Sequence, residues 1–110
     1  MAQKTSKYSE SQNLHDKIQF CLGRIEAVGL MICEGDEDCE QLIKYILADI
    51  RERLVSGENV FSVIDKAERE AWYYIQRDYP YCEVCKKAWK EAFKTIRYCL
   101  KRQFAQILSI

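Results

Sequence analysis

The sequence predicts an all-α protein, a compact up-down-up-down four-helix bundle, and three observations favour this fold. Apolar residues recur at steps of three and four along four segments, which is the periodicity of one helix face. The chain of 110 residues has only four glycines and one proline, too few for the many turns of a β-sandwich or barrel. The joints between the segments are short, so consecutive helices should be antiparallel neighbours. An irregular helical packing is the main alternative.

The first half of the chain predicts two helices. Residues 1–8 are polar and should fray, and 9–110 should form one helical domain, whose first helix spans 9–33. Gly35 is suited to follow a helix end because it adopts a left-handed conformation without strain. Asp36 can then accept a backbone N–H as the N-cap of a second helix over 36–55.

The second half predicts two more helices. Asn59 is a good N-cap for a third helix over 59–78, and Gly57 can end the helix before it. Proline is favoured at the first position of a helix, so we expect the fourth helix to begin at Pro80 and to span 80–106.

Charge is divided unevenly along the chain. Residues 1–70 carry nine Lys/Arg and fourteen Asp/Glu, a charge of −5, whereas residues 71–110 carry eight and three, a charge of +5. One face of the fourth predicted helix is strongly basic; its members are Lys86, Lys87, Lys90, Lys94, Arg97 and Lys101. Such a face can be simply solvated, can dock onto an acidic protein surface or a second copy of the chain, or can bind a nucleic-acid backbone.

Six cysteines offer several chemistries. Cys82 and Cys85 form a CxxC pair, and Cys33 and Cys39 should lie at the same end of an up-down bundle, so these four could hold zinc. A disulfide or a redox pair is also open, although the βαβ context of thioredoxin-like sites is missing. The interpretation with the most support is structural thiols packed as small apolar groups, with Cys85 and Cys99 facing the interior.

Tyrosines cluster around the third joint. Tyr73 points away from the predicted core, and Tyr79 and Tyr81 flank Pro80. Exposed tyrosines are common in protein interfaces. Packing of the joint against itself explains the cluster equally well.

No catalytic constellation can be read from this sequence, which has one histidine and no Gly-rich phosphate loop. We therefore expect that the protein is not an enzyme and that it needs no cofactor, with zinc as the one possibility left open. The sequence is typical of a small interaction protein that inhibits or adapts a larger protein with an acidic surface, by analogy with accessory proteins of phages and mobile elements. The first alternative is a nucleic-acid-associated regulator, and the second alternative is a zinc- or redox-responsive protein.

The beginning of the chain is polar and has no apolar segment, which predicts a cytoplasmic protein with reduced thiols and no membrane contact. The sequence is also compatible with a homodimer.

Overall fold

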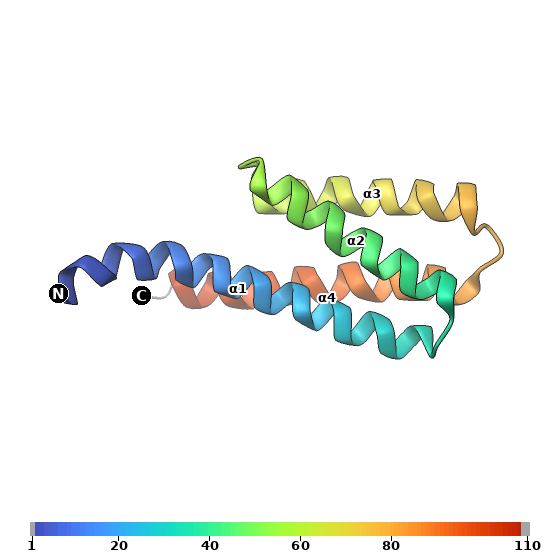
Figure 1. Cartoon of the computed structure of the whole chain (residues 1–110), viewed down its shortest axis with the longest axis horizontal. Coiled ribbons are helices and arrows are strands. Elements are labelled where there is room, and N and C mark those ends of the chain that lie inside the picture. Colours follow the sequence, from blue (N-terminus) through green and yellow to red (C-terminus); the bar gives the residue numbers. More distant parts are fainter. Residues whose placement is uncertain (1, 109–110) are drawn as a thin grey trace.

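A computed structural model describes the backbone of residues 2–108 and the side chains of residues 15–103. The four helices in this part of the chain are α1 (Ala2–Cys33), α2 (Glu37–Val55), α3 (Val60–Asp78) and α4 (Glu83–Leu108). They run alternately in opposite directions (Figure 1). α1 and α3 each pack against α2 and α4, and α2 also contacts α4. The described residues contain no strand, and the predicted all-helical bundle is confirmed.

The predicted caps of α2 and α3 are confirmed. The carboxylate of Asp36 accepts the backbone N–H of Cys39 at 2.9 Å, and α2 begins at the next residue. The side-chain oxygen of Asn59 likewise accepts the backbone N–H groups of Phe61 and Ser62 in the first turn of α3. Gly35 and Gly57 both have φ of +82°, a conformation that residues with a Cβ rarely adopt. These four residues therefore fix both ends of the first two joints.

The predicted start of α4 is wrong by three residues. Pro80 lies in a turn, not in the helix, and the N–H of Cys82 donates to the carbonyl oxygen of Tyr79 at 3.1 Å across this turn. α4 begins at Glu83, so Cys82 occupies the position just before the helix. Its Sγ accepts the backbone N–H of Cys85 at 3.1 Å, which satisfies one free donor of the first turn.

α1 begins at Ala2, earlier than predicted. Side chains of residues 1–14 lie outside the described set, so the expected fraying of residues 1–8 stays a prediction. Further along α1, a buried glycine lets α2 approach closely. A Cβ built on Gly29 would lie 2.5 Å from Cδ1 of Ile43, too close for an ordinary contact.

The core is formed by apolar side chains from all four helices, and among the described residues no polar or charged side chain is buried. Cys85 and Cys99 are buried, as predicted. The prediction of free thiols is wrong, because all six cysteines are paired: Cys21–Cys99, Cys33–Cys39 and Cys82–Cys85. Cys21 and Cys99 face each other from α1 and α4 with their Cα atoms 5.7 Å apart, a normal disulfide separation. Helical periodicity placed these residues inside but did not show which of them face one another.

None of the helices in the described part of the chain is both long enough and apolar enough to cross a membrane.

Candidate functional site

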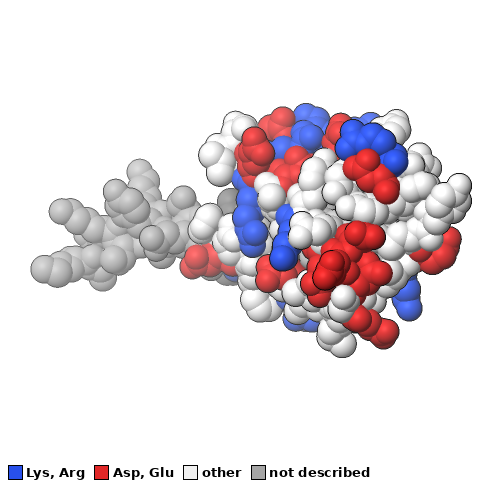
Figure 2. Space-filling model, turned by 45° about the vertical axis from the view of Figure 1, so that its right-hand side comes forward, with Lys and Arg blue, Asp and Glu red and all other residues white. Residues whose placement is uncertain are grey.

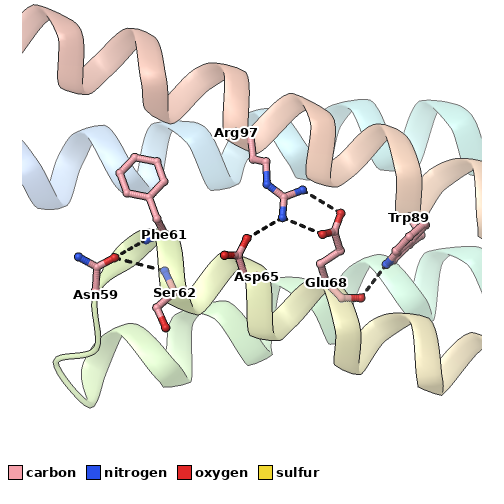
Figure 3. Close-up of polar contacts among 7 residues, drawn as sticks. All are labelled: Asn59, Phe61, Ser62, Asp65, Glu68, Trp89 and Arg97. Carbon is pink, nitrogen blue, oxygen red and sulfur yellow. Dashed lines mark hydrogen bonds and ion pairs between the residues drawn. The ribbon is translucent and has the colours of Figure 1, made fainter.

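Charged side chains bridge α3 and α4 at the seam between them (Figure 3). The guanidinium of Arg97 donates to both carboxylate oxygens of Glu68, at 2.8 and 2.7 Å, and to Asp65 at 2.9 Å. These hydrogen bonds raise the pKa of Arg97 above its usual value, with the bond to Glu68 as the largest cause. Arg97 belongs to the predicted basic face, but its charge is already neutralised within the bundle.

Two tryptophans lie next to this network. The Nε1–H group of Trp89 donates to the backbone oxygen of Glu68 at 2.9 Å, and Figure 3 shows the indole reaching from α4 toward α3. Its ring centroid lies 4.7 Å from that of Trp72 on α3, and both side chains stay partly exposed. The hydrogen bond and the ring contact together hold the indoles in fixed positions at the surface.

An open cleft of about 440 Å³ runs along this seam. We call it the α3–α4 cleft; its lining residues are Glu68, Arg69, Trp72, Tyr73, Gln76 and Trp89. Tyr73, one of the three tyrosines singled out in the sequence, is 65% exposed at its edge. Helical periodicity in the sequence did not reveal this cleft, because it does not show where two helices leave space between them.

The other two predicted tyrosines lie elsewhere. Tyr79 is half-buried and packs edge-on against Tyr74, with ring centroids 5.6 Å apart. Hydrogen bonding to Tyr74, followed by burial, raises the pKa of Tyr79 to about 12. Tyr81 is 94% exposed in the turn before α4. The predicted aromatic cluster is therefore divided between the cleft, a packed joint and a free turn.

The basic face of α4 separates into paired and unpaired cations. Lys86 contacts Glu83 at 3.4 Å on the same helix, and Arg97 is held by α3. The remaining four make no ion pair with any described residue and are exposed; we call Lys87, Lys90, Lys94 and Lys101 the lysine ridge. On the face shown in Figure 2, basic and acidic side chains are interspersed.

A second cleft, of about 600 Å³, lies between α1 and α4, and Lys94 of the ridge lines it. Two exposed aromatic residues also line it, Phe20 from α1 and Tyr98 from α4. Each has an arginine over its ring, Arg24 at 5.7 Å and Arg102 at 5.8 Å from the ring centroid. The outer face of α4 is therefore basic, with an aromatic cleft on either side of it.

All four cysteines proposed as metal ligands lie at the end of the bundle that holds the first and third joints. The Sγ of Cys39 is 3.8 Å from the backbone oxygen of Val84, which confirms that these joints are neighbours. The proposed four-cysteine zinc set is wrong for this structure, because disulfide sulfurs have no thiolate to offer a metal. Among the described residues, the carboxylate of Asp36 comes near two of these sulfurs: ligand atoms of Asp36, Cys82 and Cys85 lie within 4.8 Å of one another, with the two sulfurs bonded to each other. Asp36 had been recognised only as a helix cap.

Comparisons of the chain with protein family models, with curated proteins and with solved structures find no match.

Proposed function

We propose that this chain is a non-enzymatic interaction protein that binds an acidic segment of a larger protein with the outer face of α3 and α4, and thereby modulates that protein. The observation that carries the proposal is that α4 bears the lysine ridge and also contributes Trp89 to the open, tryptophan-lined α3–α4 cleft. The ridge would attract the acidic segment, and the cleft would take one aromatic or large apolar side chain from it.

The contrast between Arg97 and the lysine ridge supports a role outside the fold. Arg97 makes two inter-helix ion pairs, so its positive charge serves the packing of α3 on α4. The ridge lysines have no such partner among the described residues, although like charges three or four positions apart disfavour a helix by a few tenths of a kcal/mol. From Lys87 to Lys101 the ridge extends over about 21 Å of helix, at 1.5 Å per residue. Three to four turns of a partner helix would match this length.

The cleft is also suited to an acidic partner. The one carboxylate that lines it, that of Glu68, is hydrogen-bonded to Arg97, which it shares with Asp65, and this reduces its repulsion of an acidic segment. Arg69, which also lines the cleft, adds a positive charge. Because Trp72 and Trp89 are already held in place, binding would order few further side chains, which favours affinity.

Selection from a random peptide display library tests this proposal with a defined probe. Peptides enriched on the folded wild type should be acidic and carry an aromatic or large apolar residue. Their affinity should fall at least tenfold with the charge reversals K87E, K90E and K94E combined, and several-fold with Tyr73→Ala. Two charge reversals on α2, Lys44→Glu and Arg51→Glu, are the matched control and should leave binding unchanged.

Two results would contradict the proposal. One is enrichment of peptides without acidic residues, and the other is equal loss of binding in the α2 control. A phosphate backbone would also be attracted to the ridge, so the same variants should be titrated with single-stranded and duplex nucleic acid. Tight, salt-dependent nucleic-acid binding without any selected peptide would favour the nucleic-acid alternative instead.

A further inference from the structure

We propose that the Cys82–Cys85 disulfide is a redox-responsive site that exchanges with low-molecular-weight thiols of the glutathione class, and that Cys82 is the sulfur they attack. The inference is independent of partner binding, because it rests on the joint end of the bundle and not on the lysine ridge. In this exchange each protein molecule reacts through its own single Cys82–Cys85 disulfide, in a fixed ratio to the thiols consumed.

Access to solvent distinguishes this disulfide from the other two. Thiol–disulfide exchange requires an incoming thiolate to reach one of the bonded sulfurs. Five of the six cysteine residues are buried, with Cys99 the most exposed of them at 6%. Cys82 alone is half-buried. All six cysteines lie in the described part of the chain, and Cys82 is the most exposed of them. Cys99 lines the cleft between α1 and α4 but exposes less of its surface.

The position of Cys82 also favours its release as a thiolate. It directly precedes α4, a helix of 26 residues, and its Sγ accepts the backbone N–H of Cys85 at 3.1 Å. The N-terminus of a helix carries partial positive charge, which stabilises a thiolate there. This placement follows from the start of α4 at Glu83, because a helix that began at Pro80 would have put Cys82 inside its first turn.

The carboxylate of Asp36 opposes that effect. One of its oxygens lies within 4.8 Å of both sulfurs, so its negative charge disfavours thiolates there and supports the oxidised pair. Asp36 is fixed in this place by its own capping bond to Cys39. The helix end and this carboxylate together set the balance between dithiol and disulfide.

The exchange takes place in two steps. A glutathione thiolate attacks Sγ of Cys82, the bond between the two cysteines breaks, and Cys85 leaves as a thiolate that takes a proton from water. A second glutathione thiolate attacks the glutathione sulfur of the mixed disulfide and releases Cys82 as a thiolate. Two thiols are thereby oxidised to glutathione disulfide, and the protein pair gains two electrons and, once protonated, two protons.

The folded full-length chain supplies its own controls for the test. We would treat it with reduced glutathione, stop the reaction with acid, alkylate the released thiols and follow each cysteine by mass spectrometry. Cys82–Cys85 should open at least about tenfold faster than Cys21–Cys99 and Cys33–Cys39, both of which are shielded. Equal rates for the three disulfides would overturn the proposal.

Single variants identify the attacked sulfur and the role of the carboxylate. After treatment with glutathione disulfide, Cys85→Ser should accumulate the mixed disulfide at Cys82, because the Cys82 thiolate attacks glutathione disulfide and releases one glutathione thiolate. Cys82→Ser should form almost none at the buried Cys85. Asp36→Asn keeps a good N-cap and should increase the reduced fraction several-fold in a fixed glutathione buffer, while Asp38→Asn should not. Faster reaction of glutathione with Cys85 than with Cys82 would contradict the assignment of Cys82 as the attacked sulfur. Binding of one zinc ion per reduced chain, with protection of both thiols from alkylation, would also contradict the proposal.

Discussion

α4 is packed differently on its two sides. Toward α1 it presents buried small and apolar groups, among them Ala88 and Ala92, and the Cys21–Cys99 disulfide joins the two helices. Toward α3 it presents Trp89 and Arg97, whose polar atoms are satisfied by Glu68 and Asp65, beside an open cleft. Each side leaves a cleft at the surface, but a disulfide joins α4 to α1, whereas hydrogen bonds and ion pairs join it to α3.

The two sides of α4 are stabilised by different interactions. Toward α1 the main contribution is apolar burial. The polar side contributes less per contact, because its ion pairs are partly solvated, but it leaves side chains at the surface. The largest and the smallest of the three effects expected below test this difference between the two sides of α4, and the middle one tests the packing of α1 on α2.

The largest loss should come from removal of the covalent link on the α1 side. The bond joins residues 78 positions apart, so its loss in Cys21→Ala/Cys99→Ala frees much entropy in the unfolded chain and should cost about 4.5 kcal/mol. The matched double variant Cys33→Ala/Cys39→Ala opens a separation of only six residues and should cost about 2 kcal/mol. Urea unfolding without reductant measures both values, and a larger loss in the short-loop variant would contradict the argument.

A smaller loss should follow from a methyl group added where α1 approaches α2. Gly29→Ala places a Cβ against Ile43 and should cost about 1–2 kcal/mol, the usual range for overpacking. Gly23 on the same helix has no atom within 4 Å of the corresponding position, so Gly23→Ala should stabilise by up to about 1 kcal/mol. Thermal unfolding of the two variants side by side should show midpoints shifted in opposite directions; a shift in the same direction would rule out a specific role for the close approach.

The smallest effect should appear on the α3 side. Arg97→Met removes both inter-helix ion pairs and should cost about 1 kcal/mol, because the pairs are partly exposed and screened. Lys94→Met removes an unpaired ridge cation and should leave stability nearly unchanged. If both variants lose equal stability, the ridge supports the fold and the distinction between paired and unpaired cations is wrong.

Local sequence signals were sufficient for most of the architecture. Asp36 and Asn59 could be recognised as N-caps because a short polar side chain directly before a segment with helical apolar periodicity commonly accepts the first free backbone N–H groups. Gly35 and Gly57 could be placed because few other residues tolerate positive φ. Each of these features depends on neighbours within four residues, which the sequence displays directly.

Features that depend on contacts between helices could not be read in this way. Pro80 suits either the first position of a helix or a turn, and the hydrogen bond from Cys82 to Tyr79 selects the turn. The partner of Cys21 depends on the register of α1 against α4. The α3–α4 cleft exists because Trp72 and Trp89 meet near the surface, a consequence of packing that no single helix pattern encodes.

The Cys21–Cys99 bond also determines how this protein would respond to mechanical tension. The first turns of α1 and the last turns of α4 lie at the same end of the bundle (Figure 1), so force applied through the two ends would peel one helix from the other. Peeling would stop at the disulfide, because residues 22–98 lie inside the covalent loop that it closes. α2, α3 and the α3–α4 cleft would carry no load. While this clamp stays oxidised, the α3–α4 cleft and Lys87, Lys90 and Lys94 would keep their arrangement under a pull that unravels the rest, whereas Lys101 lies outside the loop.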